Sequence, residues 1–262
     1  MKQFITITFF ALLFSTFTFA ELPQIDKKFK DARVYTQEDN FTVTTGIIER
    51  TYQLTAYGLK TVSLKNKNSQ IDWVNRASGI LCDWDINGQT KGKLVNFNVF
   101  VSDDEKFTDQ HLCAEAEFEY PEQKIRLKYI VWAYPGAEGL RTQLKIKALE
   151  GFNYDENIFN PGITESIQLS QKTDSKTAFG YMQGIKTNMD IDILTEKIVE
   201  PDMQKIDWAN GIILSDANKG ILFIKESNKH TSLNEEDDVA TGEFIIGEYS
   251  LEVTGAGGFK QG

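Results

Sequence analysis

The chain has 262 residues and a formal net charge of −10 at pH 7, and 41% of its residues are hydrophobic. This acidic balance argues against nucleic acid and anionic membranes as partners, because both require a basic face. The length and the apolar content suffice for one large domain with a packed core.

The first residues predict a secretory signal peptide over 1–20. A basic start is followed by an uncharged apolar run from Phe4 to Phe19, and Ala20 supplies a small residue at the cleavage site. The alternative is a membrane anchor, but this run is at the short end of the ~20 apolar residues that a bilayer requires. We therefore expect a protein exported to the periplasm or the extracellular space, with no membrane partner.

After the signal peptide, residues 21–40 are polar and lack a clear period, which predicts an irregular leader segment on the surface. From Phe41 onward, short apolar alternations are separated by turn residues, a pattern typical of an antiparallel β-sandwich. We expect this sandwich to span 41–254. The predicted strands cover 41–44, 47–56, 59–64, 94–102, 114–120, 129–134, 140–147, 177–182, 185–194, 207–215, 220–225 and 242–253.

The clearest element is a β-hairpin over 125–149. From Leu140 to Lys147 apolar and polar residues alternate strictly, as a half-buried strand requires. The preceding run 129–134 is apolar on both faces, which places it inside a packed sheet. Pro135 and Gly136 begin the reversal between the two strands.

Three glutamates, Glu115, Glu117 and Glu119, alternate with apolar residues in another predicted strand. Paired carboxylates suggest acid/base chemistry, but the alternation puts all three on one solvated face, and we favour that interpretation.

Cys82 and Cys113 are the only two cysteines. An oxidising compartment permits a disulfide between them. Two small buried side chains in neighbouring strands explain them equally well, and both alternatives stay open. With only His111 and His230 as histidines, the clustered spacing of a zinc site is missing.

The segment from Asp83 to Gly88 carries two hypotheses. Its D-x-D-x-N-G spacing makes Asp83, Asp85 and Asn87 weak candidates for a calcium loop, although Leu94 stands where the twelfth-position glutamate belongs. A turn between strands explains the same residues.

The second hypothesis is carbohydrate binding by Trp73, Asp83 and Trp84. Sugar sites combine an aromatic ring with polar groups that take the hydroxyls. The competing and favoured interpretation is that both indoles are core or turn residues.

Several phrases, taken in order, resemble the amino-terminal β-sandwich domain of α-galactosidases of the melibiase type. They are 45–54 (TGIIERTYQL), 59–66 (LKTVSLKN), 133–141 (AYPGAEGLR), 220–230 (GILFIKESNKH) and 242–244 (GEF). The resemblance implies a galactose-mutarotase-like super-sandwich and a carbohydrate-active enzyme with galactoside-type substrates. It also implies a catalytic barrel in cis, which supplies the two catalytic aspartates, and a possible homo-oligomer.

On this resemblance, the glycine-rich segment 255–262 is the start of a linker to the barrel. It lacks the lysine and the strand–loop–helix setting of a phosphate-binding loop. We expect no catalytic residues, no metal and no cofactor in this chain.

The leading prediction is the exported, non-catalytic β-sandwich part of an α-galactosidase-like glycoside hydrolase, which shapes or oligomerises the enzyme. The alternatives are a free-standing carbohydrate-binding module and, last, an aldose mutarotase-like enzyme. The last needs a histidine acid and a glutamate base facing a sugar.

Overall fold

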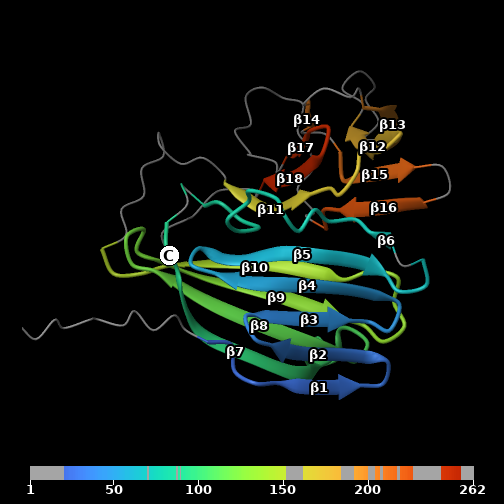
Figure 1. Cartoon of the computed structure of the whole chain (residues 1–262). Helices are drawn as coiled ribbons and strands as arrows, with labels where there is room; N and C mark the ends of the chain where they lie inside the picture. Colours follow the sequence, from blue (N-terminus) through green and yellow to red (C-terminus); the bar gives the residue numbers. More distant parts are fainter. Residues whose placement is uncertain are drawn as a thin grey trace, which may run out of the picture.

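The structure, a computed structural model, describes residues 21–69, 71–86, 88, 90–151, 162–183, 192–199, 204–206, 209–216, 219–226 and 243–254. The predicted signal peptide and the glycine-rich carboxyl end lie outside these residues. Every sheet is antiparallel, which confirms the predicted all-β class (Figure 1). In the described part, no helix has the length and apolarity to cross a membrane.

The amino-terminal half is a sandwich of two sheets. The first has the order β1 (Asp26–Phe29), β2 (Ala32–Gln37), β3 (Asn40–Thr44), β4 (Ile48–Thr55), β5 (Gly58–Asn66) and β6 (Ile71–Asp72). The second has the order β10 (Arg141–Ala148), β9 (Ile125–Ala133), β8 (His111–Tyr120) and β7 (Lys93–Ser102), with a 3-10 turn η1 (Asp104–Lys106) after β7.

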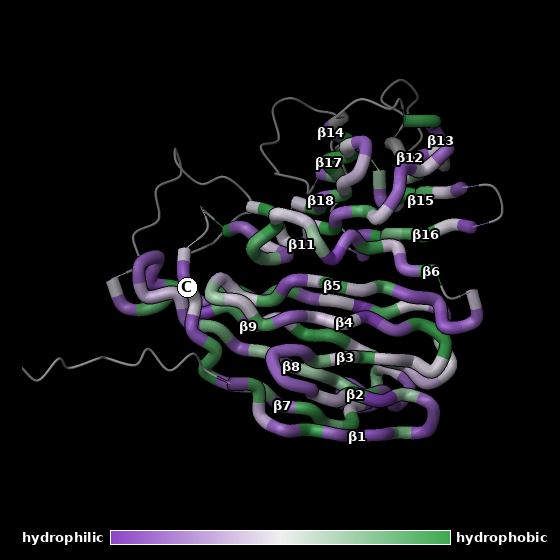
Figure 2. Tube along the Cα trace, in the orientation of Figure 1, coloured by the Kyte–Doolittle hydropathy of each residue, from purple (hydrophilic) through white to green (hydrophobic). Residues whose placement is uncertain are grey.

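Large aromatic and aliphatic side chains fill the space between these two sheets. Hydrophobic and hydrophilic residues alternate along these strands (Figure 2), and because neighbouring residues of a strand point to opposite faces, the apolar residues gather on one face of each sheet. The largest fully buried members of this first core include Phe41, Tyr52, Leu59, Phe118 and Tyr129. The stacked rings of Phe41 and Tyr52 have centroids 4.8 Å apart.

The carboxyl-terminal half has two smaller sheets and a second core. One sheet has the order β11 (Ile163–Gln168), β18 (Ser250–Thr254), β17 (Phe244–Ile246) and β14 (Gln204–Ile206). The other has the order β13 (Asp192–Ile198), β12 (Ser175–Gln183), β15 (Gly211–Asp216) and β16 (Lys219–Ile224). Residues from both sheets form the second core, among them Ile167, Ala178, Ile212, Leu214, Phe244 and Leu251.

The predicted hairpin is confirmed. Strands β9 and β10 pair from Arg141↔Trp132 to Ala148↔Ile125. Strand β9 lies inside its sheet, and from Tyr129 to Ala133 both of its faces are buried: Tyr129 lies in the first core, while Ile130 and Trp132 form a small cluster with Cys113 on the outer face.

The prediction of an irregular leader over 21–40 is wrong. Residues 26–37 form β1 and β2, and Leu22, Ala32 and Val34 are buried in the first core. The sequence signal is weak because β2 contributes only two apolar residues to the core, and one of them is an alanine. The sandwich therefore begins before Phe41.

The segment between β6 and β7 lies along the boundary of the two halves. Its backbone pairs with β11 and the residues just after it, through Asn75 N to Gln168 O (2.8 Å) and Ser170 N to Trp73 O (2.9 Å). Asp85 and Ile163 exchange two backbone hydrogen bonds of 2.8 and 2.7 Å. The two halves are thus joined by backbone hydrogen bonds, and Figure 1 shows β11 beside the amino-terminal sandwich.

We predict that Gly58→Ala strongly destabilises the fold. Gly58 has φ of +140°, and a Cβ there would lie 2.4 Å from Trp84 Cζ2 and 2.6 Å from Cys82 Sγ. Both neighbours are core residues, so the substitution combines overpacking, at about 1–3 kcal/mol, with a strained backbone. The matched control is Gly79→Ala, because nothing lies within 4 Å of that position. Urea unfolding checks the prediction, and equal stability of the two variants would contradict it.

Candidate functional site

The densest group of chemically active side chains is a buried network centred on Arg50 of β4. Its guanidinium donates through Nε and Nη2 to Thr61 Oγ1 at 2.9 and 2.6 Å, and through Nη2 to Asp83 Oδ2 at 3.2 Å. Thr61 in turn donates to Asp83 from its backbone N (2.7 Å) and from its hydroxyl. Arg50 is 5% exposed and Asp83 is 1% exposed. Because both groups are shielded from water, each charge requires the other as its counter-ion.

Glu165 brings the carboxyl-terminal half into the same network. It lies on β11, and its Oε1 accepts a hydrogen bond from Arg50 Nη2. Its Oε2 accepts from Tyr129 Oη at 3.1 Å and from Thr142 Oγ1 at 3.4 Å. One guanidinium thus holds two carboxylates from distant parts of the chain.

The aromatic neighbours of Arg50 complete its surroundings. The Arg50 guanidinium carbon lies 4.7 Å from the Tyr52 ring centroid, and the hydroxyls of Tyr52 and Tyr129 are 3.4 Å apart. Burial raises the pKa of both tyrosines, so both phenols stay protonated. These rings exclude water from the charges, which strengthens each interaction among them.

Burial also controls the protonation of Asp83. Desolvation raises its pKa to about 7, against the lowering effects of the Arg50 charge and of the hydrogen bonds from Thr61. For Arg50, desolvation opposes the charged form, but Glu165 and Asp83 outweigh it and leave the pKa above its ordinary value. The guanidinium therefore stays charged.

This arrangement suits a structural role better than a catalytic one. Glycosidase carboxyls flank a shared cleft that a sugar can enter. Here the side chains of Asp83 and Glu165 are 2% and 13% exposed, and both carboxylates are engaged by Arg50. The network links β4, β5 and β9 of one half to β11 of the other.

The predicted carbohydrate-binding residues are buried, and this corrects the hypothesis of a sugar-binding surface. Trp73 and Trp84 are 5% and 3% exposed. The Trp84 ring stacks on Tyr129, with centroids 5.2 Å apart, and meets Phe118 edge-on. Its face is therefore already occupied by core residues, and the Asp83 carboxylate is occupied by Arg50 and Thr61.

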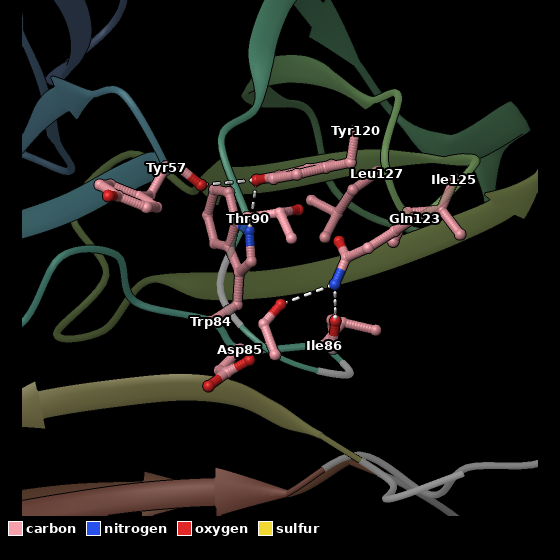
Figure 3. Close-up of a pocket in the computed structure, with 10 residues that line it drawn as sticks. Tyr57, Trp84, Asp85, Ile86, Thr90, Tyr120, Gln123, Ile125 and Leu127 are labelled. Carbon is pink, nitrogen blue, oxygen red and sulfur yellow. Dashed lines mark hydrogen bonds between the residues drawn. The ribbon is translucent and has the colours of Figure 1, made fainter. Parts of the chain in front are cut away.

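A small pocket lies beside the edge of the Trp84 ring (Figure 3). Trp84 Nε1 donates to Tyr120 Oη at 2.8 Å, and Tyr120 Oη donates to the Tyr57 carbonyl at 2.7 Å. Gln123 Nε2 donates to the carbonyls of Ile86 and Gly88, both at 2.6 Å. The free volume is about 10 Å3, room for about one water molecule. A sugar ring requires far more space.

The calcium-loop hypothesis is not supported by the described residues. Asp83 turns its oxygens to Arg50 and Thr61, and Asp85 uses its backbone to bridge to Ile163. Asn87 lies outside the described residues. Within the described part, no three His, Cys, Asp or Glu side chains are arranged to hold a metal ion.

The disulfide alternative is wrong, because Cys82 and Cys113 are both free and buried. Cys82 belongs to the first core, whereas Cys113 points to the outer face of β8 and packs with Ile130 and Trp132. Burial raises the pKa of the Cys113 thiol to about 12, so it remains a protonated, apolar side chain.

The three glutamates of β8 are half-buried rather than fully solvated, and each has a basic partner. Glu119 and Glu117 face Arg126, at 2.6 and 3.8 Å, and Glu115 is 3.0 Å from Lys128 Nζ. They form a cross-strand charge ladder with β9, as the prediction of a polar face requires.

His111 is fully buried at the start of β8. Its Nδ1 is 2.9 Å from the Asp109 carbonyl, which only accepts hydrogen bonds, so Nδ1 carries a proton. His230 lies outside the described residues. The pocket beside Trp84 has neither a histidine nor a glutamate among its lining residues.

The sequence analysis did not identify Arg50 and Glu165 as partners. A signal was present for Arg50, because it interrupts the apolar face that Ile48, Tyr52 and Leu54 form in the same strand. No local signal exists for Glu165, which is 115 residues away from Arg50 in the chain.

We predict that Arg50→Met lowers the free energy of unfolding by about 3–5 kcal/mol, because it leaves buried carboxylates without a counter-ion. The control is Arg33→Met, which removes an exposed ion pair with Asp26 and should leave the free energy of unfolding nearly unchanged. Urea unfolding of both variants measures the difference. A loss of under ~1 kcal/mol for Arg50→Met would show that the network does not stabilise the fold.

We also predict a pH dependence of stability that Asp83 causes. Its pKa is about 7 in the folded state and near 3.9 when unfolded, so the native state binds the proton more tightly. Its stabilising contribution is complete below about pH 4 and is lost as the pH rises through 7. Asp83→Asn should flatten this part of the profile. Unfolding free energies of both proteins from pH 4.5 to pH 8 test it, and parallel profiles would refute it.

No family model matches the chain, and no curated protein matches it. In structure, the chain is similar to the galactosidase domain of the alpha-galactosidase-sucrose kinase AgaSK, with 10% sequence identity and a TM-score of 0.43. The alignment covers 82% of this chain and 37% of that one.

Proposed function

We propose that this chain is the exported, non-catalytic β-sandwich part of an α-galactosidase-like glycoside hydrolase, in which it shapes or oligomerises the enzyme. The observation that carries the proposal is a set of contacts: the phrases that resemble the α-galactosidase domain touch one another in the fold. When segments that are far apart in the chain contact one another, they form part of one structural unit.

Three contacts support this point. Arg50 of the first phrase donates to Thr61 of the second. Thr45 binds the hairpin phrase twice, from its Oγ1 to the Ala137 carbonyl (2.6 Å) and through its own carbonyl to Gly136 N (2.7 Å). In the third contact, Arg141 of the hairpin forms an ion pair with Glu226 of the fourth phrase.

The chemistry of these contacts supports a non-catalytic part. Each one fixes a strand or a turn, and the carboxylates of the buried Asp83 and the partly buried Glu165 both bind Arg50. Hydrolysis with retention requires two carboxyls about 5 Å apart on a shared cleft. On this proposal, the catalytic pair and the galactoside site belong to a barrel domain in cis.

The first test is the reading frame beyond codon 262 in the source DNA. We expect it to continue into several hundred codons of alternating strand and helix patterns with two aspartates at strand ends. The 262-residue protein alone should then leave p-nitrophenyl α-galactoside intact, whereas the longer protein hydrolyses it. A longer protein with both aspartates changed to alanine is the control. A stop codon directly after Gly262, or hydrolysis by the 262-residue protein, would overturn the proposal.

A further inference from the structure

A histidine with one unused ring nitrogen is buried beside the loop that joins β7 to β8. His111 is 0% exposed, and the register pairs it with Ser102, the last residue of β7. Its Nδ1 donates to the Asp109 carbonyl, whereas its Nε2 is buried and has no hydrogen-bond partner. Asp104 Oδ1 lies 3.8 Å from this Nε2. A neutral ring therefore places an acceptor nitrogen opposite a carboxylate, at a distance too long for a hydrogen bond.

The carboxylate near His111 belongs to a strained turn. Asp104, Glu105 and Lys106 form η1, and their φ angles are +48°, +59° and +72°. The left-handed region is unfavourable for a residue with a Cβ, and here three such residues follow one another. The Asp104 carboxylate accepts hydrogen bonds from the hydroxyls of Ser102 and Thr108, both at 3.2 Å, which is long for this type of bond. The strained turn therefore requires a stronger anchor than these hydroxyls.

We propose that η1 is a pH-sensitive latch, in which a proton on His111 Nε2 joins the ring to Asp104 and holds the turn in its left-handed conformation. The proton turns Nε2 from an acceptor into a charged donor, and a charge-assisted hydrogen bond to the carboxylate then forms. Histidine gains or loses this proton between about pH 5 and pH 8. Loss of the proton releases the turn. This inference does not depend on the proposed function.

The consequence of the latch reaches the protein surface. Phe107 directly follows η1 and is 87% exposed, the largest exposed fraction among the large hydrophobic residues of the described part. Its position depends on the turn before it. The protonation of one buried ring therefore controls how an exposed aromatic side chain is presented.

The other groups around the ring bring no charge that competes with the latch. The Tyr134 and Trp132 rings lie beside it, with centroids 4.5 and 6.4 Å away. Cys113, the next residue on the same face of β8, keeps its proton because burial raises its pKa to about 12. Glu115, one position further along this face, is 3.0 Å from Lys128 Nζ and is paired with it. Because burial opposes a charge on the ring, protonation depends on the Asp104 carboxylate.

Solution NMR of the full chain tests the latch through two observables. The first is the protonation of the His111 ring, which its Cε1 and Hε1 chemical shifts report between about pH 5 and pH 8. The second is hydrogen exchange of the Phe107 and Thr108 amides, whose hydrogen bonds to the carbonyls of Asp104 (3.2 Å) and Asp103 (3.1 Å) close the turn. After correction for the intrinsic pH dependence of exchange, the protection of both amides should fall at least ~10-fold as the ring loses its proton.

Asp104→Asn tests the role of the carboxylate. Asparagine has the same size and tolerates the left-handed region, so the turn can form, but it offers no charge to the ring. We expect the pH dependence of protection to be lost in this variant. The matched control is Asp109→Asn, which removes an equal charge from an exposed side chain of the same loop and keeps the backbone carbonyl that His111 uses. This control should keep the full pH dependence.

Three results would each overturn the latch. The first is a His111 ring that stays neutral down to about pH 5, and the second is a ring that titrates while the protection of the turn stays constant. The third is an Asp104→Asn variant with the pH dependence of the unmodified chain. The His111 signal is identified by its absence from His111→Gln, since His230 is the only other histidine.

Discussion

A buried guanidinium shared by one buried and one partly buried carboxylate is the constraint on which the rest of this structure depends. Arg50 is nearly inaccessible to water, so it requires partners that stay in place. Asp83 and Thr61 supply them from its own half, and Glu165 supplies the other from β11. Any relative movement of the two halves would separate Arg50 from Glu165 and leave charges buried without counter-ions.

The network is also connected to the first core. Tyr129 lies in the first core and donates to Glu165, so an aromatic residue of one half also positions the carboxylate of the other. The backbone bridge between Asp85 and Ile163 runs beside the same contact, two residues away from Asp83 and from Glu165. The halves are therefore coupled by polar interactions at their boundary, while each keeps its own apolar interior.

The sequence predicts those parts of the fold whose signal is local. The hairpin of β9 and β10 follows from alternation and a Pro-Gly turn, and it forms as expected. Strand β2 was missed because two small apolar residues do not stand out from a polar background. The network could not be predicted, because the partners of Arg50 are separated in the chain by 33 and 115 residues. Asp83 and Trp84 suggested a sugar-binding site because sugar sites and buried polar networks contain the same residue types.

Strands β9 and β15 show why an apolar sequence alone does not say whether a face is covered. Both have apolar residues at consecutive positions, which predicts burial on two sides. On β9 the outer residue Trp132 is covered, with the Arg141 guanidinium 5.0 Å above its ring and Cys113 and Ile130 beside it. On β15 the outer residue Ile213 lies between Thr177 and Leu222 in the sheet and remains 36% exposed. The same apolar pattern therefore ends in a covered cluster on β9 and in a partly exposed face on β15, because coverage depends on which distant residues pack over each strand.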